Sequence, residues 1–168
     1  WVGINTALPN RLVRATIESG CLEPWLGPIA GIRPEVAYGL NRRSRIDLLL
    51  TPAEGAADQR PIYLEVKNTT WCDGDLALFP DTVTERGQKH LEELMGVLPE
   101  ARAVLVPCLS RSDLQRFAPG DQADPRYGEL FREALAAGVE VLPCRYSFSA
   151  SSIDWLGVAS VQAQSGGS

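Results

Sequence analysis

The stretch from 61 to 70 constrains the fold most, because it places two opposite charges on one face of a predicted strand. It runs Pro-Ile-Tyr-Leu-Glu-Val-Lys-Asn-Thr-Thr, and its alternating β-branched and aromatic residues predict a β-strand over 62–70. Residues two apart in a strand share a face, so Glu65 and Lys67 project together, opposite Leu64 and Val66. Charges at mid-strand are costly to bury unless a site uses them. Taken alone, the pattern also fits an ordinary ion-paired sheet face exposed to solvent.

A second predicted strand, over 44–50, carries a lone carboxylate, Asp47, at its centre. If the two strands are neighbours, Asp47 and Glu65 converge, which the sequence by itself does not settle. Carboxylate oxygens and water suit Mg²⁺ or Mn²⁺ better than Zn²⁺. The alternative for Asp47 is a capping or turn carboxylate near the end of a strand, and we favour the metal-binding interpretation.

Periodicity along the rest of the chain predicts an α/β fold. Apolar residues at helical spacing, with Pro near the start and Gly after the end, predict helices over 6–20 and 124–138. Further strands are expected over 33–39, 101–109, 139–148 and, at an edge, 153–161; loops are expected over 21–34, 51–60, 71–78 and 110–123. The first two strands form a hairpin through 40–43. The order predicts one domain over 1–161, a mixed sheet flanked by helices, and a disordered tail over 162–168.

The remaining predicted helix begins with a capping box, Thr82 as the cap and Glu85 three residues on. Its apolar stripe becomes small and polar toward the N-terminal end, at Gly87 and Gln88. A Gly costs about 1 kcal/mol relative to Ala in a helix interior, so we expect a close approach of backbone there. Gln88 is placed to reach the same pocket as Glu65, with a solvated first-turn residue as the equal alternative. His90, the single histidine, is expected to be a packing or surface residue, because one His makes no zinc site. The inner stripe comprises Leu91, Leu94, Met95 and Leu98.

Three segments carry a resemblance to a known family: Ser44-Arg45-Ile46-Asp47, residues 64–68, and the run from Ala77 to Leu91 containing Phe-Pro-Asp and Glu-Arg-Gly-Gln-Lys-His. They resemble the sugar fermentation stimulation protein A family, and 3–6, 8–10 and 117–119 are similar to further segments of it. The resemblance implies a restriction-endonuclease-like (PD-(D/E)XK) fold. It also implies that Asp47 and Glu65 bind Mg²⁺ or Mn²⁺, that Lys67 orients water or stabilises the phosphate, and that Gln88 supports the site.

The resemblance implies further that family members carry an N-terminal OB-like domain ahead of this point. The chain begins at Trp1 and enters at once into Val-Gly-Ile, so we expect a piece that lacks that domain. Nucleases of this fold often recruit one more carboxylate, for which Glu35 and Glu18 are equal candidates.

The net charge of the chain limits how it can bind nucleic acid. Of the 168 residues 45% are apolar and 22% charged, and the net charge of −5 counts against tight, sequence-blind duplex binding. A local basic rim remains expected, with a solvated hairpin tip as the alternative. Its members would be Arg42, Arg43, Arg45, Arg86 and Lys89. The four cysteines are widely spaced without C-x-x-C, which predicts reduced thiols rather than a zinc site.

No apolar run approaches the ~18 residues of a membrane span and no signal peptide is visible, so we expect a cytoplasmic protein with no membrane partner. The sequence does not determine whether the protein forms a homo-oligomer. The leading hypothesis is a metal-dependent nucleic-acid phosphodiesterase that acts on DNA or RNA. The alternative is a DNA-binding regulator of sugar (maltose) metabolism genes with little or no catalysis, as the family name implies. A metal-binding scaffold with no nucleic-acid role is a third hypothesis.

Overall fold

The computed structural model describes residues 7–164. Within them the main sheet has seven strands in the order β1-β2-β3-β6-β9-β10, and β8 pairs with β6 beside this path. β1, β2 and β3 are antiparallel neighbours, β3, β6 and β9 are parallel, and β10 returns antiparallel. The predicted mixed sheet flanked by helices is therefore confirmed. The bounds are Ile29–Tyr38 (β1), Ser44–Pro52 (β2), Ile62–Thr69 (β3), Arg102–Leu109 (β6), Glu140–Val141 (β8), Cys144–Phe148 (β9) and Ile153–Val158 (β10).

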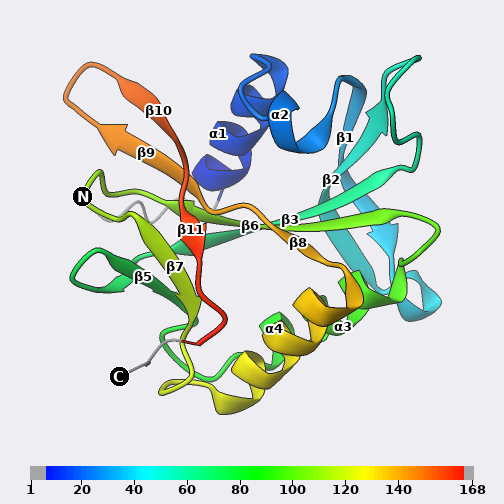
Figure 1. The fold of residues 1–168 in the computed structure, drawn as a ribbon. Coiled ribbons are helices and arrows are strands. Elements are labelled where there is room, and N and C mark those ends of the chain that lie inside the picture. The colour runs from blue at the N-terminus through cyan, green and yellow to red at the C-terminus, as the bar shows by residue number, and fades with distance from the viewer. Residues whose placement is uncertain (1–6, 165–168) are drawn as a thin grey trace.

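Helices cover both faces of this sheet (Figure 1). α1 (Ala7–Glu18) and α2 (Glu23–Leu26) lie on one face, and α3 (Glu85–Gly96) and α4 (Pro125–Ala137) lie on the other. A second sheet, in the order β11-β7-β5-β4, packs on the side of α3 and α4 (Figure 1). Its bounds are Trp71–Asp73 (β4), Leu76–Phe79 (β5), Arg116–Pro119 (β7) and Ser160–Val161 (β11), and a 3₁₀ turn, η1 (Leu40–Arg42), joins β1 to β2.

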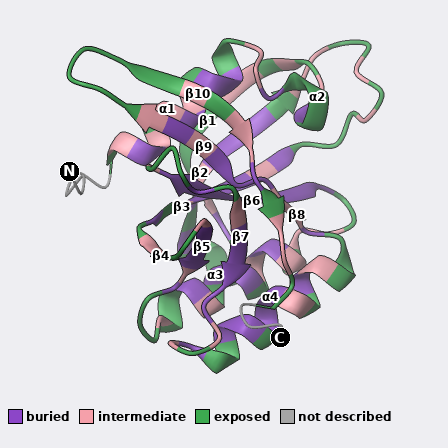
Figure 2. Cartoon of the chain, turned by 60° about the vertical axis from the view of Figure 1, so that its left-hand side comes forward, coloured by how far each residue is buried: buried purple, intermediate pink, exposed green. Residues whose placement is uncertain are grey.

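The central strand β6 is buried on both faces, as its uninterrupted apolar run predicts (Figure 2). Side chains of a strand point alternately to the two faces. Val104 and Val106 accordingly pack in the core beneath α1, and Ala103 and Leu105 pack in the core beneath α3 and α4. The sheet thus separates two apolar cores, and a polar site has to lie where the sheet or its covering helices leave a gap.

α4 begins and ends where its sequence predicts. Asp124 caps it by accepting a hydrogen bond from the Tyr127 backbone N–H, and Gly138 ends it in the left-handed region. The predicted cap of α3 was wrong by two residues. Thr84, not Thr82, is the cap: its hydroxyl accepts from the Gly87 N–H, and Glu85 is the first helical residue rather than the third.

Three of the predicted loops contain regular structure. Residues 71–78 form the β4–β5 hairpin, in which Trp71 pairs with Leu78. Residues 110–123 contain β7, where Phe117 is fully buried beside β5, and residues 21–34 contain α2 and the first half of β1. The predicted strand over 139–148 is two short strands, β8 and β9, both parallel partners of β6. The short elements were missed because segments of two to four residues, such as α2, β4, β5, β7 and β8, are too short for a periodic pattern to be recognised.

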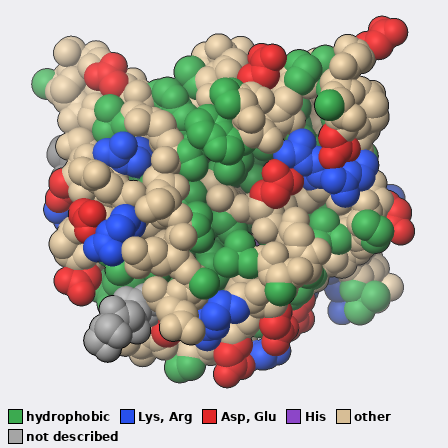
Figure 3. Space-filling view, viewed as in Figure 1, with side chains coloured by type: hydrophobic (Ala, Val, Ile, Leu, Met, Phe, Trp, Pro, Cys, Tyr) green, Lys and Arg blue, Asp and Glu red, His purple; other side chains and the backbone are tan. Residues whose placement is uncertain are grey.

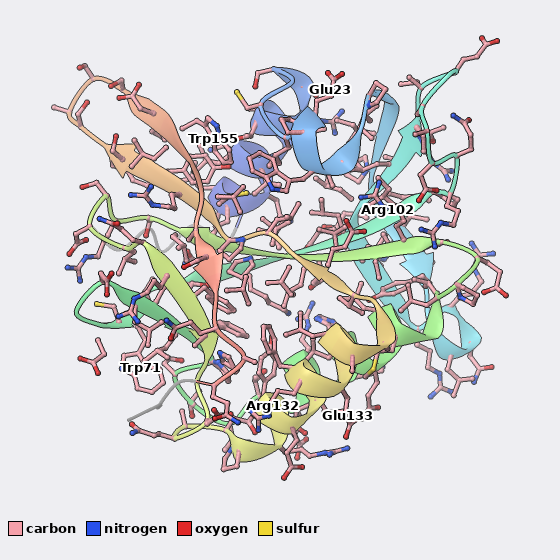
Figure 4. All side chains as sticks on the ribbon, in the orientation of Figure 1. Glu23, Trp71, Arg102, Arg132, Glu133 and Trp155 are labelled. Carbon is pink, nitrogen blue, oxygen red and sulfur yellow. The ribbon has the colours of Figure 1, made fainter. Side chains whose placement is uncertain are left out.

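The C-terminal end of the described chain is hydrogen-bonded to the rest of the fold. Gln162 donates its backbone N–H to the Phe117 carbonyl, and Arg132 of α4, labelled in Figure 4, donates to the Ala163 carbonyl. The predicted disordered tail stays a prediction for 165–168, which lie outside the described residues, as does the predicted helix start at Thr6. Across residues 7–164 we find no helix with the length and hydropathy needed to cross a bilayer.

Candidate functional site

The main sheet opens between β2 and β3, and this opening creates the candidate site. The two strands pair only from Leu48 to Leu50 against Ile62 to Leu64. Beyond Leu64, β3 keeps pairing with β6 alone, while β2 stays paired with β1 as far as Ser44. At the point of separation the Val66 N–H donates to Asp47 Oδ2 at 2.7 Å instead of to a strand carbonyl. A side chain thus completes the ladder, and the gap between the strands stays open.

The backbone opposite Asp47 is distorted as well. Glu35 of β1 has φ of 55°, a left-handed conformation that costs a non-Gly residue about 1–3 kcal/mol and gathers at functional sites. On β2, Ile46 and Leu48 are two apart yet pack in different cores. The regular alternation of the strand is therefore interrupted at Asp47, which faces the opening.

A pocket of about 680 Å³ occupies this opening. Its walls come from five elements: α1, β1, β2, β3 and the first turns of α3. The lining residues are Ala7, Pro9, Asn10, Arg11, Arg14, Pro34, Glu35, Asp47, Leu48, Glu65, Val66, Lys67, Asn68, Arg86 and His90. The predicted Asp47, Glu65 and Lys67 all line it, so the structure brings these three together.

Asp47 is held from two sides. Besides Val66, Asn10 of α1 donates its side-chain amide to Asp47 Oδ1 at 3.0 Å. Burial raises the pKa of Asp47 to about 6, and the negative charge of Glu65 adds to this rise, while the two hydrogen bonds and Lys67 oppose it. Two carboxylates close together in a partly buried pocket repel each other, and a bound cation would offset that repulsion.

Glu65, Lys67 and His90 form a compact group at the base of the pocket. Glu65 is 4% exposed, and its Oε1 lies 3.2 Å from Lys67 Nζ and 3.0 Å from His90 Nδ1. Lys67 Nζ and His90 Nδ1 are 2.8 Å apart. Burial alone would raise the pKa of Glu65, but His90 and Lys67 together hold it below its ordinary value. The second oxygen, Oε2, is buried and has no hydrogen-bond partner among residues 7–164.

His90, expected to be a packing or surface residue, lines the pocket, whereas Gln88 does not. The Gln88 amide instead donates to both carboxylate oxygens of Asp124 at 3.0 Å. One signal in the sequence favoured His90: it follows Arg86 by four residues, which places both on one face of α3, and both line the pocket. The direction of that face depends on how α3 packs, which periodicity does not give.

The basic residues near the pocket differ from those predicted. Arg86 lines it as expected, and Arg11 and Arg14 of α1 join it, although the sequence reasoning had not singled them out. Arg42, Arg43, Arg45 and Lys89 do not line it; Arg45 donates to the Glu35 carbonyl and Lys89 lies 3.6 Å from Glu93. On the face drawn in Figure 3, charged side chains of both signs are interspersed around hydrophobic surface, so that face carries no basic field.

Of the two candidates for a further carboxylate, only one lies at the pocket. Glu35 lines the pocket, whereas Glu18 lies outside it and pairs with Arg14 at 2.9 Å. Between 7 and 164, no three His, Cys, Asp or Glu side chains are grouped so as to hold a metal by themselves. Asp47 and Glu65 nonetheless fit a hard cation such as Mg²⁺, because Mg²⁺ commonly takes one or two carboxylates and keeps water ligands. The unpartnered Oε2 of Glu65 is the observation that agrees best with a missing positive partner.

Comparison with known proteins assigns the family. A model described as the sugar fermentation stimulation protein RE domain matches residues 7–152. Sugar fermentation stimulation protein homologs of Synechococcus sp. (strain RCC307) and Parasynechococcus marenigrum (strain WH8102) are 75% and 78% identical. The alignments cover 96% and 94% of this chain, and 65% and 62% of the relatives.

A solved structure supports the same assignment. SfsA of Pyrococcus furiosus, in complex with Ca²⁺, matches with a TM-score of 0.82 at 30% identity, over 95% of this chain and 66% of that one. The chain thus spans less than two thirds of the length of these relatives, and its fold is the restriction-endonuclease-like mixed sheet flanked by helices. With a family model over most of its residues and the fold of a solved member, this chain belongs to the sugar fermentation stimulation protein family.

Proposed function

We propose that this domain hydrolyses phosphodiester bonds of nucleic acids, with Mg²⁺ or Mn²⁺ held by Asp47 and Glu65. The observation that carries the proposal is the meeting of two carboxylates and an ammonium group in one pocket, where Glu65 Oε2 is buried without a partner. Bound Ca²⁺ in the Pyrococcus furiosus relative supports cation binding by this family. Glu35, at the wall of the same pocket, is a candidate for a further, water-mediated ligand.

Each remaining side chain has a task that its contacts suggest. When bound, a divalent cation in such a site lowers the pKa of its water and offsets charge on the phosphate. Lys67 would orient the attacking water or stabilise charge on the phosphate oxygens. His90 would act as a positioning residue, because its Nδ1 lies within 3.0 Å of both Glu65 and Lys67. Arg11 and Arg86, on two different helices, would hold the phosphate backbone at the rim.

The test is a cleavage assay on single- and double-stranded DNA and RNA, with and without Mg²⁺ or Mn²⁺. We expect metal-dependent cleavage by the wild type, reduced about 100-fold or more in Glu65→Gln and in Lys67→Ala. Glu18→Gln is the matched control, because it removes an exposed carboxylate of α1 that does not line the pocket. Its cleavage rate should equal that of the wild type.

A different result would favour the other function. If all variants bind nucleic acid equally and none cleaves it with either metal, the hydrolase proposal fails. The domain would then fit a nucleic-acid-binding regulator, as the name of its relatives suggests. Cleavage that survives in Glu65→Gln would also contradict the proposal, since it would point to a contaminating nuclease.

A further inference from the structure

A second pocket, of about 660 Å³, lies next to the candidate active site. It is a slot between two apolar walls. Phe148 and Ile153 form one wall, directly opposite each other in the β9–β10 ladder and still 40% and 42% exposed. Leu8 and Leu12 of α1 form the other wall, and the buried Cys108 of β6 lies at the floor.

The slot also has polar lining residues. They are Asn68, Ser110 and Ser149, and within residues 7–164 no charged residue lines it. At the hairpin tip the Ser149 N–H donates to the Ser152 carbonyl at 2.9 Å, and the Ser149 and Ser152 hydroxyls lie 3.0 Å apart. These bonds fix the turn that carries Phe148, so the aromatic wall belongs to an ordered hairpin.

The slot shares part of its lining with the candidate active site. Pro9 and Asn68 line both pockets, and Asn68 is the next residue after Lys67 on β3. One side of this shared boundary therefore carries carboxylates, Lys67 and arginines, and the other side is apolar and aromatic. A ligand that spans the boundary needs an anionic group joined to a flat, weakly polar group over a few bonds.

An unpaired nucleotide has this chemistry. We propose that the slot lined by Phe148, Ile153, Leu8 and Leu12 receives a single unpaired nucleobase of the strand whose phosphate lies in the adjoining pocket. Phe148 stacks on the base, and the rim residues Asn68 and Ser110 offer hydrogen bonds to its edge. The inference rests on the proposed function and names its substrate class: single-stranded nucleic acid, or an end or damaged position whose base has left the stack.

A base inside a duplex would not meet these requirements. Its faces are covered by neighbouring bases and its edge by its partner, so entering the slot costs unstacking and unpairing, a few kcal/mol for a paired base. On a protein of net charge −5, phosphate contacts alone offer little compensation for that cost. Stacking in the slot supplies affinity that does not depend on charge.

The test compares two fluorescent strands of equal length, an oligothymidylate and one with abasic tetrahydrofuran residues, which keeps every phosphate and loses every base. Affinities are measured by fluorescence anisotropy in Ca²⁺, and a gel confirms that the strands stay intact. We expect the oligothymidylate to bind about tenfold more tightly, equivalent to about 1.4 kcal/mol and within the range of base–aromatic stacking. Phe148→Ala should bring the ratio of the two affinities close to one, and Phe148→Trp should keep it near tenfold.

Leu156→Ala is the matched control. Leu156 is an apolar residue of the same hairpin, is 37% exposed and does not line the slot. The affinity ratio of this variant for the two strands should therefore equal that of the wild type. Melting curves of all variants by circular dichroism separate loss of the slot from loss of the fold. Equal affinity of the wild type for both strands, or an unchanged ratio in Phe148→Ala, overturns the inference.

Cleavage is measured in a separate assay. Cleavage of the abasic strand with Mg²⁺ at saturating protein should be the same in the wild type and in Phe148→Ala. If both cleave it at equal rates but no base-dependent affinity exists, the slot inference fails and the hydrolase stands. If the wild type cleaves neither strand, the hydrolase proposal fails instead.

Discussion

At the residue scale, Asp124 shows how one buried carboxylate joins two helices. It is 1% exposed and accepts hydrogen bonds from the backbone N–H groups of Thr84, at the start of α3, and Tyr127, in the first turn of α4. The Gln88 amide adds two more contacts. Burial would raise the pKa of Asp124, but these bonds outweigh it and hold the pKa below its ordinary value.

Replacing this residue tests its role and gives a pH signature. We expect Asp124→Asn to lower the free energy of unfolding at pH 7 by about 1.5–3 kcal/mol, the range for hydrogen bonds to a charged group. Because the folded-state pKa lies below the unfolded value of about 3.9, the contribution is complete above that pH and is lost as the pH falls through the folded-state pKa. Urea titrations at pH 7 and at progressively lower pH measure the difference, which should shrink with acidification.

The same substitution at an exposed ion pair is the control for Asp124. Asp113 is exposed and pairs with Arg111 at 2.6 Å. Asp113→Asn should change the free energy of unfolding by less than about 1 kcal/mol, as is typical of surface pairs. An equal loss in both variants would mean that Asp124 acts as an ordinary surface carboxylate.

At the scale of the element, Gly87 of α3 lies where the side chains of Thr84 and Tyr127 come close to the helix. A Cβ on Gly87 would lie 2.7 Å from Thr84 Cγ2 and 3.3 Å from Tyr127 Cε2. The predicted close approach of backbone at Gly87 was wrong: the atoms nearest to it belong to side chains, those of the helix cap Thr84 and of Tyr127 in the neighbouring α4. Turning Thr84 away would release the clash but break its hydrogen bond to the Gly87 N–H.

We therefore expect Gly87→Ala to lower the free energy of unfolding by about 1–3 kcal/mol, the usual cost of overpacking, although Ala favours helix formation. Gly96→Ala is the matched control at the other end of α3, where a Cβ would have no neighbour within 4 Å. That variant should be neutral or slightly more stable. Thermal and urea unfolding of the two proteins decide the point, and a stabilised Gly87→Ala would contradict the packing argument.

At the scale of the whole molecule, Arg102 fastens the α2 segment to the main sheet (it is labelled in Figure 4). From the first position of β6 its guanidinium donates to the carbonyls of Trp25 and Leu26, each at 3.0 Å. It also pairs with both carboxylate oxygens of Glu140 at 2.7 and 2.9 Å. One side chain thereby joins α2, β6 and β8.

Arg102→Ala should lower the free energy of unfolding by about 2–3 kcal/mol, because it leaves two carbonyls without their charged donor. The loss stays moderate, since the Glu140 side chain is 35% exposed and water can solvate it. Arg60→Ala is the control: Arg60 is exposed and bonds to Asp58 and to the Pro99 carbonyl. It should change stability by less than about 1 kcal/mol. If both variants lost the same free energy of unfolding, burial of the Arg102 guanidinium would contribute nothing to stability.

Much of the fold follows from local sequence signals. The strand over 62–70, the hairpin before it, the buried β6 and the Asp124 and Gly138 boundaries of α4 were all predictable, because alternation and capping act over a few residues. The short strands β4, β5 and β7 were not, because their pairing partners, not their own residues, keep them extended. The cap of α3 was misplaced for a related reason: Thr82 and Thr84 both suit the role, and the hydrogen bond of the Thr84 N–H to Asp124 favours Thr84.

The sequence by itself determined which side chains are available at the site: Glu65 and Lys67 share a face because strands have a period of two, and Asp47 lies on the strand before them. Only the tertiary structure decided which groups meet them. The opening of β2 from β3, the rotation of α3 that presents His90 and Arg86 rather than Gln88, and the approach of α1 with Asn10 and Arg11 all depend on long-range packing. Local periodicity sets which face a residue occupies, and the apolar cores set what that face touches.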